Sequence, residues 1–205
     1  MSYPRYIIEN RKKLRGKVLD LGCGDKKLPK SIGMDYNDTL KLDIQHNLLK
    51  FPYPIKSESF NHIFLNSVIE HIDRYDYCDL FKELKRILKK KGSIHIHVPY
   101  FRHASGLANL EHITYLGHGS LNNITDLYIK SEFRVIGDSY KILRILKTPV
   151  EAFLNFFPGA THGLFSRIIP VYAMHYEIRK KPFKNAIKGI VSYQLSHPPH
   201  KFKNI

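Results

Sequence analysis

The segment VLDLGCGDKK, residues 18–27, decides the fold. Apolar residues around an aspartate predict a buried strand, and Gly22 and Gly24 predict a tight turn directly after it. Because glycine has no Cβ, such a turn lets backbone N–H groups come close to a ligand. A dinucleotide-binding fingerprint needs a third glycine three residues after Gly24, where this chain has Lys27. The spacing therefore disfavours a nicotinamide-dependent dehydrogenase.

Beyond this turn, apolar runs alternate with helical patterns, which is typical of an α/β protein with a largely parallel sheet. The strongest helical pattern covers residues 75–90, with Asp73 or Asp76 as its N-cap and Gly92 after its end. We predict a Rossmann-like, seven-stranded, mostly parallel sheet with helices on both faces. The expected strands cover residues 17–21, 31–35, 40–43, 60–66, 93–99, 133–137 and 171–178.

Composition bounds the class of protein. The chain has 205 residues, of which 43% are hydrophobic and 25% charged, so we expect one folded domain rather than a disordered or fibrous chain. Cys23 and Cys78 are too few and too isolated for a disulfide framework or a structural zinc site. The N-terminus does not resemble a secretory signal. We therefore expect a cytoplasmic protein.

The net charge of +15 lies at the two ends of the chain. Residues 1–31 hold nine basic and three acidic residues, residues 130–205 hold thirteen and four, and the middle is neutral. Such a field attracts anionic partners such as RNA, phosphorylated metabolites or acidic lipid. A lysine-rich surface that only keeps the protein soluble explains the same charge equally well.

The apolar tract at residues 152–174 is about as long as a membrane span. Because Pro158, Arg167 and Pro170 are among the residues that interrupt it, we interpret it as a buried or lid segment, with no transmembrane segment in the chain. Peripheral contact with a membrane stays open as an alternative. Residues 183–205 form a basic C-terminal extension with a double proline, so the expected domain is residues 1–182.

Asp35 ends the second expected strand. In a doubly wound sheet, an acid at this position faces the crevice beside the glycine turn, where it can accept hydrogen bonds from both hydroxyls of a ribose. Taken alone, Asp35 is equally well explained as a turn residue before Asn37. Its combination with Asp20, Gly22 and Gly24 favours a nucleoside site.

Four segments follow one another in a characteristic order: KVLDLGCGDKKLP (17–29), IGMDYN (32–37), LDIQHNLLKFPYPIKSESFNHIFLNSVIEHI (42–72) and ELKRILKKKGSIHIHVPYF (83–101). Together they resemble the small methyltransferase domains of the class I S-adenosylmethionine-dependent methyltransferases, over roughly residues 16–101. The resemblance implies an enzyme with S-adenosyl-L-methionine as its methyl donor.

The resemblance also implies cofactor-binding residues. Asp20, Gly22 and Gly24 would shape the turn that holds the methionine part, with Asp20 near its amino group. Asp35 would hold the ribose hydroxyls.

Two further positions follow from the same resemblance. Asn47 and Leu48 would meet the adenine, although many relatives have an acid where this chain has Asn47. Asn66 would border the methyl-bearing sulfonium.

The chain departs from the family pattern at two places. Only eleven positions separate Gly24 from Asp35, so the helix after the glycine turn must be very short. The segment KKKGS, residues 89–93, replaces the usual Pro-Gly-Gly turn, which we expect to change only a loop.

The acceptor side and a partial cap should lie at about residues 100–170, because ligands bind beyond the carboxyl ends of parallel strands. The segment NLEH, residues 109–112, resembles a "DPTH"-like motif of some methyltransferases, with Asn109 in place of the acid. Histidine accepts a proton near neutral pH, so His112 and His103 are the candidate catalytic bases. The alternative is that they pack or cap loops, which is the commoner role for any one histidine. The candidate substrate-binding residues are Tyr100, Tyr115 and His118.

Other histidines and acids carry less information. His103, Glu111, His112 and His118 are ligand types, but their spacing forms no metal motif, and we assign no metal site. His71 in the segment SVIEHI is as well explained by structural support as by catalysis. His95 and His97 should share one face of a strand and are given no function.

The sequence therefore predicts a methyltransferase that acts on an O or N nucleophile. The acceptor is unidentified, with a phosphorylated metabolite, a glycan and RNA as candidates. A non-catalytic cofactor-binding scaffold or sensor is one alternative, since fold alone does not establish activity. An RNA-binding protein with a vestigial pocket is another.

Overall fold

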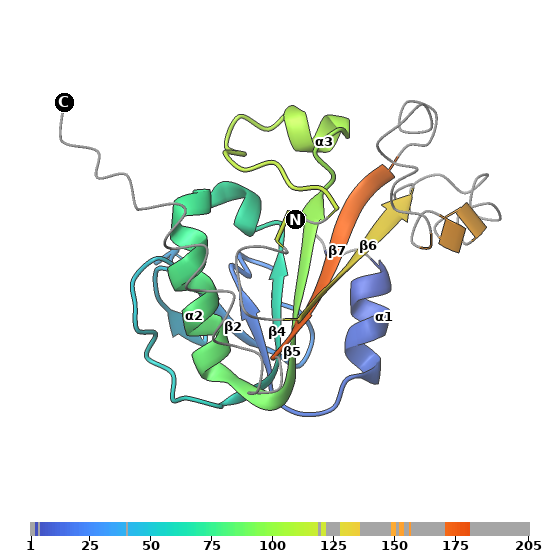
Figure 1. Ribbon diagram of the computed structural model, residues 1–205. Helices are drawn as coiled ribbons and strands as arrows, with labels where there is room; N and C mark the ends of the chain where they lie inside the picture. Colours follow the sequence, from blue (N-terminus) through green and yellow to red (C-terminus); the bar gives the residue numbers. More distant parts are fainter. Residues whose placement is uncertain are drawn as a thin grey trace, which may run out of the picture.

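The computed structural model (Figure 1) describes residues 3, 5–39, 41–118, 120–121, 128–135, 149–150, 152–153, 156 and 171–180. Its strands are β1 (Val18–Leu21), β2 (Ile32–Asp35), β3 (Ile44–Gln45), β4 (Phe60–Asn66), β5 (Leu88–Pro99), β6 (Tyr128–Val135) and β7 (Val171–Arg179). They form one sheet in the order β3-β2-β1-β4-β5-β7-β6. All pairs from β3 to β5 are parallel, and β7 is antiparallel to both β5 and β6. The predicted Rossmann-like, mostly parallel sheet is confirmed.

Helices lie on both faces of this sheet. The described helices are α1 (Arg5–Lys13), α2 (Tyr77–Ile87) and α3 (Ala104–Leu107), with the 3-10 turns η1 (Ile69–His71) and η2 (Arg74–Asp76). Phe64 of β4 packs with Ile7 of α1, whereas its neighbours Ile63 and Leu65 pack in the larger core with Leu84 of α2. Successive strand residues point to opposite faces, so α1 and α2 cover opposite sides of the sheet (Figure 1).

The third strand differs from its prediction. Residues 40–43 were expected to form it, but pairing with β2 begins only at Ile44, which lies opposite Met34. The cause is Asp43, whose carboxylate accepts a hydrogen bond from the backbone N–H of Gly33 at 2.7 Å and another from Lys27 Nζ at 2.6 Å. A side chain thus takes a backbone donor that would otherwise extend the ladder.

The junction between α2 and β5 also corrects the sequence analysis. The helix ends at Ile87, and Leu88 already has extended backbone and pairs with Phe60 of β4. Gly92 therefore lies inside β5 instead of ending the helix, and the segment 89–93 is strand rather than a changed loop. A Cβ at Gly92 would lie 2.6 Å from Leu88 Cδ1 and 2.7 Å from the Asn61 backbone oxygen, so this strand position needs glycine.

The helix starts are also corrected in detail. Asp73 accepts a hydrogen bond from the Tyr75 amide and caps η2, not α2. Asp76 precedes α2 without a capping side-chain hydrogen bond.

Some elements were missed or shifted. No helix was predicted at α1, and β6 begins at Tyr128 rather than at residue 133. Residues 22–31 contain turns and no helix, so the short helix expected after the glycine turn does not form. The extension 183–205 and most of the tract 152–174 lie outside the described residues. The described residues of the tract are 152, 153 and 156 and residues 171–174, which belong to β7. Within the described ranges, no helix has the length and apolar character that a membrane crossing requires.

Candidate active site

The glycine turn at the end of β1 has two different requirements for glycine. Gly22 (φ +66°) and Gly24 (φ +55°) both have left-handed backbone, which disfavours other residues. A Cβ on Gly22 would lie 2.6 Å from Val68 Cγ2, so Gly22 is needed for packing. A Cβ on Gly24 would meet no atom within 4 Å. Gly24 therefore faces open space into which a ligand can approach the backbone.

Asp35 lies beside this turn at the end of β2. Its Oδ2 accepts a hydrogen bond from the Gly24 amide at 2.9 Å, and its Oδ1 accepts from the amides of Tyr36 at 2.8 Å and Asn37 at 3.2 Å. Asp35 as a whole is 8% exposed. These bonds orient the carboxylate, and a carboxylate has about four lone-pair directions, so it retains capacity for a ligand.

Asp20 is fully buried in β1 and bonded to the chain itself. The Tyr3 hydroxyl and the Leu28 amide both donate to its carboxylate. Burial raises the pKa of Asp20 to about 6, while the hydrogen bonds from Tyr3 and Leu28 and the charge of Lys27 act in the opposite direction. In this arrangement Asp20 shapes the turn rather than offering a free carboxylate.

The other predicted cofactor residues lie near the same strand ends. Asn47 is exposed, and its side-chain oxygen accepts from the Leu49 amide at 2.8 Å, whereas Leu48 is half-buried against the core. Asn66 ends β4 next to Leu65, which is paired with Leu21 of β1. Within the described part of the chain, the buried Oδ1 of Asn66 has no hydrogen-bond partner. A buried acceptor in this state is a candidate for contact with a ligand.

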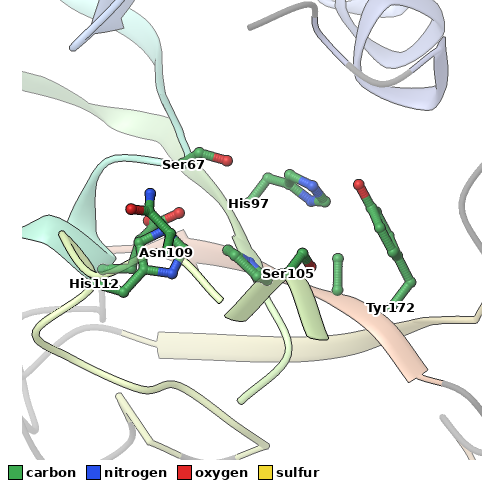
Figure 2. A pocket seen from close by; sticks show the side chains of 9 residues that line it. Ser67, His97, Ser105, Asn109, His112 and Tyr172 are labelled. Carbon is green, nitrogen blue, oxygen red and sulfur yellow. The ribbon is translucent and has the colours of Figure 1, made fainter. Parts of the chain in front are cut away.

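A pocket of about 160 Å³ lies beyond the carboxyl ends of β4 and β5 (Figure 2). Figure 2 shows Asn109 beside His112, with His97 and Tyr172 across the pocket from them. The residues that line it are Ser67, Glu70, His97, Pro99, Ser105, Asn109, His112, Tyr172 and Ala173. They come from the loop and 3-10 turn after β4, from β5, from α3 and its following loop, and from β7. None is a lysine or an arginine.

One of the two predicted catalytic histidines lines this pocket, and the other lies beside it. His112 lines it, is 7% exposed, and has its Nδ1 2.9 Å from the Gly106 carbonyl oxygen. His103 is not a lining residue, but its Nδ1 lies 2.7 Å from Ser105 Oγ and its ring centroid lies 5.0 Å from that of Tyr172. His103 therefore contacts two residues that line the pocket, Ser105 and Tyr172, without lining it itself.

The predicted substrate residues are placed differently. Tyr100 is 4% exposed and belongs to the hydrophobic core. Tyr115 is 51% exposed and His118 is half-buried. None of the three is among the residues that line the pocket.

Sequence reasoning missed several pocket residues. His97 lines the pocket, whereas His95 stacks on Phe64 with ring centroids 4.6 Å apart, and burial lowers the pKa of His95 to about 4. Glu70 lies next to His71 in the segment SVIEHI, which was considered only for its histidine. Tyr172 comes from the antiparallel strand β7, and no local pattern in the sequence indicates that pairing.

A family model described as "Methyltransferase domain" matches residues 3–128. The chain belongs to this methyltransferase family. The match extends from the residue that contacts Asp20 to the start of β6, so the methyltransferase domain includes α1, the glycine turn and the pocket loop. It confirms the resemblance identified from the sequence. No curated protein matches the chain significantly.

Solved structures share the fold of this methyltransferase domain at low sequence identity. A SAM-dependent methyltransferase from Archaeoglobus fulgidus is 18% identical, with a TM-score of 0.58 over 86% of this chain and 90% of that one. A possible histamine N-methyltransferase from Thermotoga maritima is 14% identical, with a TM-score of 0.55 over 84% and 87%. Phosphoethanolamine N-methyltransferase 2 from Haemonchus contortus, solved with phosphomonomethylethanolamine and S-adenosylhomocysteine, is 16% identical, with a TM-score of 0.55 over 86% and 52%.

Proposed function

We propose that this protein is an S-adenosylmethionine-dependent methyltransferase that methylates a hydroxyl or amine. The observation that carries the proposal is the 2.9 Å hydrogen bond from the Gly24 amide to Asp35 Oδ2. This bond joins the glycine turn after β1 to the oriented carboxylate at the end of the neighbouring strand β2. The space beside Gly24 is open. The methionine part of the cofactor needs the open turn, and the ribose hydroxyls need the carboxylate.

Each cofactor residue has a role under this proposal. Asp35 accepts hydrogen bonds from the ribose, and Gly22 and Gly24 hold the methionine part. Asp20 stabilises the conformation of the turn that contains these glycines. Asn47 and Leu48 contact the adenine. The bound cofactor supplies an activated methyl group on a positively charged sulfur.

Asn66 and Ser67 join the cofactor site to the pocket. The buried amide oxygen of Asn66 lies at the end of β4, and Ser67, the next residue, lines the pocket. Ser67 has left-handed backbone (φ +53°) and donates its amide to the His97 carbonyl oxygen at 2.8 Å. We therefore place the methyl group near these residues, with the acceptor in the pocket on the far side. Alignment of the two is the main catalytic contribution of the protein.

His112 is the candidate for removing a proton from the acceptor. Its Nδ1 lies against the Gly106 carbonyl, which can only accept, so its Nε2 carries the lone pair. His103 at the rim is the second candidate. Tyr115 and His118 are candidate contacts for a larger part of the acceptor, whereas Tyr100 has a packing role.

The lining of the pocket also limits the acceptor. It contains one carboxyl group and two histidines but no lysine or arginine. The reacting end of the acceptor is therefore a neutral hydroxyl or amine. An anionic part, if the acceptor is a phosphorylated metabolite, a glycan or RNA, therefore binds outside this pocket.

Calorimetric titration with S-adenosylmethionine and S-adenosylhomocysteine tests the proposal. We expect wild-type dissociation constants on the order of micromolar. Asp35→Ala should weaken binding at least about tenfold, because it removes hydrogen bonds to a charged group. Asp38→Ala is the matched control: its carboxylate is exposed in the same loop, and its loss should leave affinity unchanged.

The remaining outcomes separate the alternatives. Equal affinity of wild type and Asp35→Ala would contradict the proposed ribose contact. Absence of binding by folded wild-type protein would overturn the methyltransferase proposal and favour the RNA-binding alternative. Cofactor binding without transfer to any hydroxyl or amine acceptor would favour the scaffold.

A further inference from the structure

Three potential metal ligands meet at the wall of the pocket. One ligand atom each from Glu70, His71 and His112 lies within 4.8 Å of the other two. Glu70 and His112 line the pocket, and His71 is half-buried next to Glu70. Tetrahedral bonds of about 2 Å separate ligand atoms by roughly 3.3 Å. Small side-chain rotations would therefore bring all three onto one cation.

Hydrogen bonds prepare both histidines for this role. Nδ1 of His71 lies 3.1 Å from the Glu111 carbonyl oxygen, and Nδ1 of His112 lies 2.9 Å from the Gly106 carbonyl oxygen. Because a carbonyl oxygen only accepts, each Nδ1 holds the proton and each Nε2 retains its lone pair. A backbone carbonyl on the far nitrogen is the usual support of a metal-binding histidine.

The carboxylate of Glu70 has no counter-charge in the described structure. The residue is 2% exposed, and neither of its oxygens has a partner with hydrogen-bond geometry among the described residues. Burial raises the pKa of Glu70 to about 7, although Ser67 and the backbone amide of Glu70 lower it in part. A buried carboxylate without a compensating charge is unfavourable, and a bound cation would supply that charge.

The two segments that carry these ligands are already held together by the backbone. The Glu70 carbonyl oxygen accepts from the amides of Ile113 at 2.9 Å and Thr114 at 3.0 Å. The Thr114 hydroxyl donates to the Ile72 carbonyl oxygen at 2.8 Å. These bonds set Glu70 and His112 on facing segments, so the arrangement of ligands does not depend on a cation to form.

We propose that Glu70, His71 and His112 bind a divalent first-row transition-metal ion such as Zn²⁺ or Fe²⁺, with its remaining coordination positions open to the pocket. Two imidazoles and one carboxylate suit such ions better than Mg²⁺ or Ca²⁺, which favour oxygen ligands. Metal binding itself does not depend on the proposed methyltransferase activity.

The role of the ion in the reaction does rest on that proposed function. An acceptor hydroxyl bound to the ion has a lowered pKa and loses its proton to water in the pocket. The oxygen then forms a bond to the methyl carbon while the carbon–sulfur bond breaks and its electron pair stays on sulfur. In the metal-bound protein the Nε2 lone pair of His112 is occupied by the ion, so this route replaces direct proton transfer to His112, which stays open only to the metal-free protein.

Titration of chelator-treated protein with Co²⁺, followed by its visible absorption bands, tests the site without turnover. Zn²⁺ should displace Co²⁺ and abolish the bands. We expect wild-type protein to bind Co²⁺ stoichiometrically, and Glu70→Gln and His112→Asn each to weaken binding at least about tenfold, since even outer partners of metal ligands contribute that much. Glu111→Gln is the matched control, because Glu111 is exposed, directly precedes His112 in the sequence and does not belong to the cluster.

Each result has a defined meaning when thermal unfolding shows that every variant is folded. Wild-type protein without Co²⁺ bands, or equal affinity of Glu70→Gln and Glu111→Gln, would overturn the metal site. Titration of the same chelated protein with S-adenosylmethionine separates the two proposals. Co²⁺ binding without cofactor binding would retain the metal site and reject the methyltransferase function. Cofactor binding without Co²⁺ binding would retain the methyltransferase function and reject the metal site.

Discussion

The Tyr3 hydroxyl lies 2.6 Å from both carboxylate oxygens of Asp20. Tyr3 precedes α1, and Asp20 is in β1, two residues before Gly22 of the cofactor turn. Burial, together with the charge of Asp20, raises the pKa of Tyr3, so the hydroxyl stays protonated and can donate. The start of the chain is thus bonded directly to the strand that carries the proposed methionine site.

Replacing Tyr3 with phenylalanine should destabilise the protein. The buried carboxylate of Asp20 would retain only the Leu28 amide as a donor, so we expect the free energy of unfolding at pH 7.5 to fall by about 1–3 kcal/mol. The loss should be smaller at pH 5, where Asp20 is protonated. Urea denaturation at both pH values measures it. Tyr36→Phe, at an exposed ring, is the control, and an equal loss at the two pH values would contradict the assignment.

The pKa of Asp20 also predicts how stability depends on pH. The folded value of about 6 lies above the ordinary 3.8, so the folded protein binds a proton more tightly than the unfolded chain does. This contribution is complete below about pH 4 and is lost as the pH rises through 6, which amounts to about 2–3 kcal/mol. Tyr3, the Leu28 amide and Lys27 lower this pKa, and Asp35 raises it.

Urea denaturation between pH 4 and pH 8 checks this prediction. The wild-type free energy of unfolding should decrease over this range more than that of Asp20→Asn, which cannot ionise. Glu70 acts in the same direction in both proteins and cancels in the comparison. Parallel curves for the two proteins would show that Asp20 does not titrate as described.

The two glycines of the turn should respond differently to alanine. Gly22→Ala combines left-handed strain with a clash against Val68, so we expect a loss of stability above about 2 kcal/mol. Gly24→Ala carries only the strain of about 1–2 kcal/mol, but its methyl group would enter the proposed cofactor space.

Gly24→Ala should therefore remain folded and bind S-adenosylmethionine at least about tenfold more weakly. Urea denaturation and calorimetry measure the two effects separately. A Gly24→Ala variant with wild-type affinity would place the cofactor elsewhere.

Sequence patterns predict the parts of the fold that are local. The four segments from β1 to β5 were found because each strand and its turn lie within a few residues, and β4 has the predicted bounds. The α2–β5 junction was misplaced because the buried position of Leu88, opposite Phe60, depends on a tertiary contact that overrides the usual signal of Gly92. β3 is shorter than predicted for a similar reason, because the side chain of Asp43 makes a tertiary contact that no local pattern indicates.

The pocket was only partly predictable. His112 could be proposed from its chemistry. Glu70 and His71, however, precede it by 42 and 41 residues, and the hydrogen bonds from the Ile113 and Thr114 amides to the Glu70 carbonyl bring the two segments together. Tyr172 reaches the pocket only because β7 pairs antiparallel with β5, with Pro99 opposite Ala173. Long-range pairing of this kind leaves no periodic signal in one sequence.

The direct passage from Ile87 in α2 to Leu88 in β5 limits where this protein can tolerate insertions. No loop at this junction can absorb an added residue. One extra residue would either rotate α2 by about 100° against the core or shift β5 by one position. The second change would turn His97 to the opposite face of the sheet and remove it from the pocket. Insertions and deletions that change which acceptor is bound should therefore be found after Pro99, where the chain leaves the sheet.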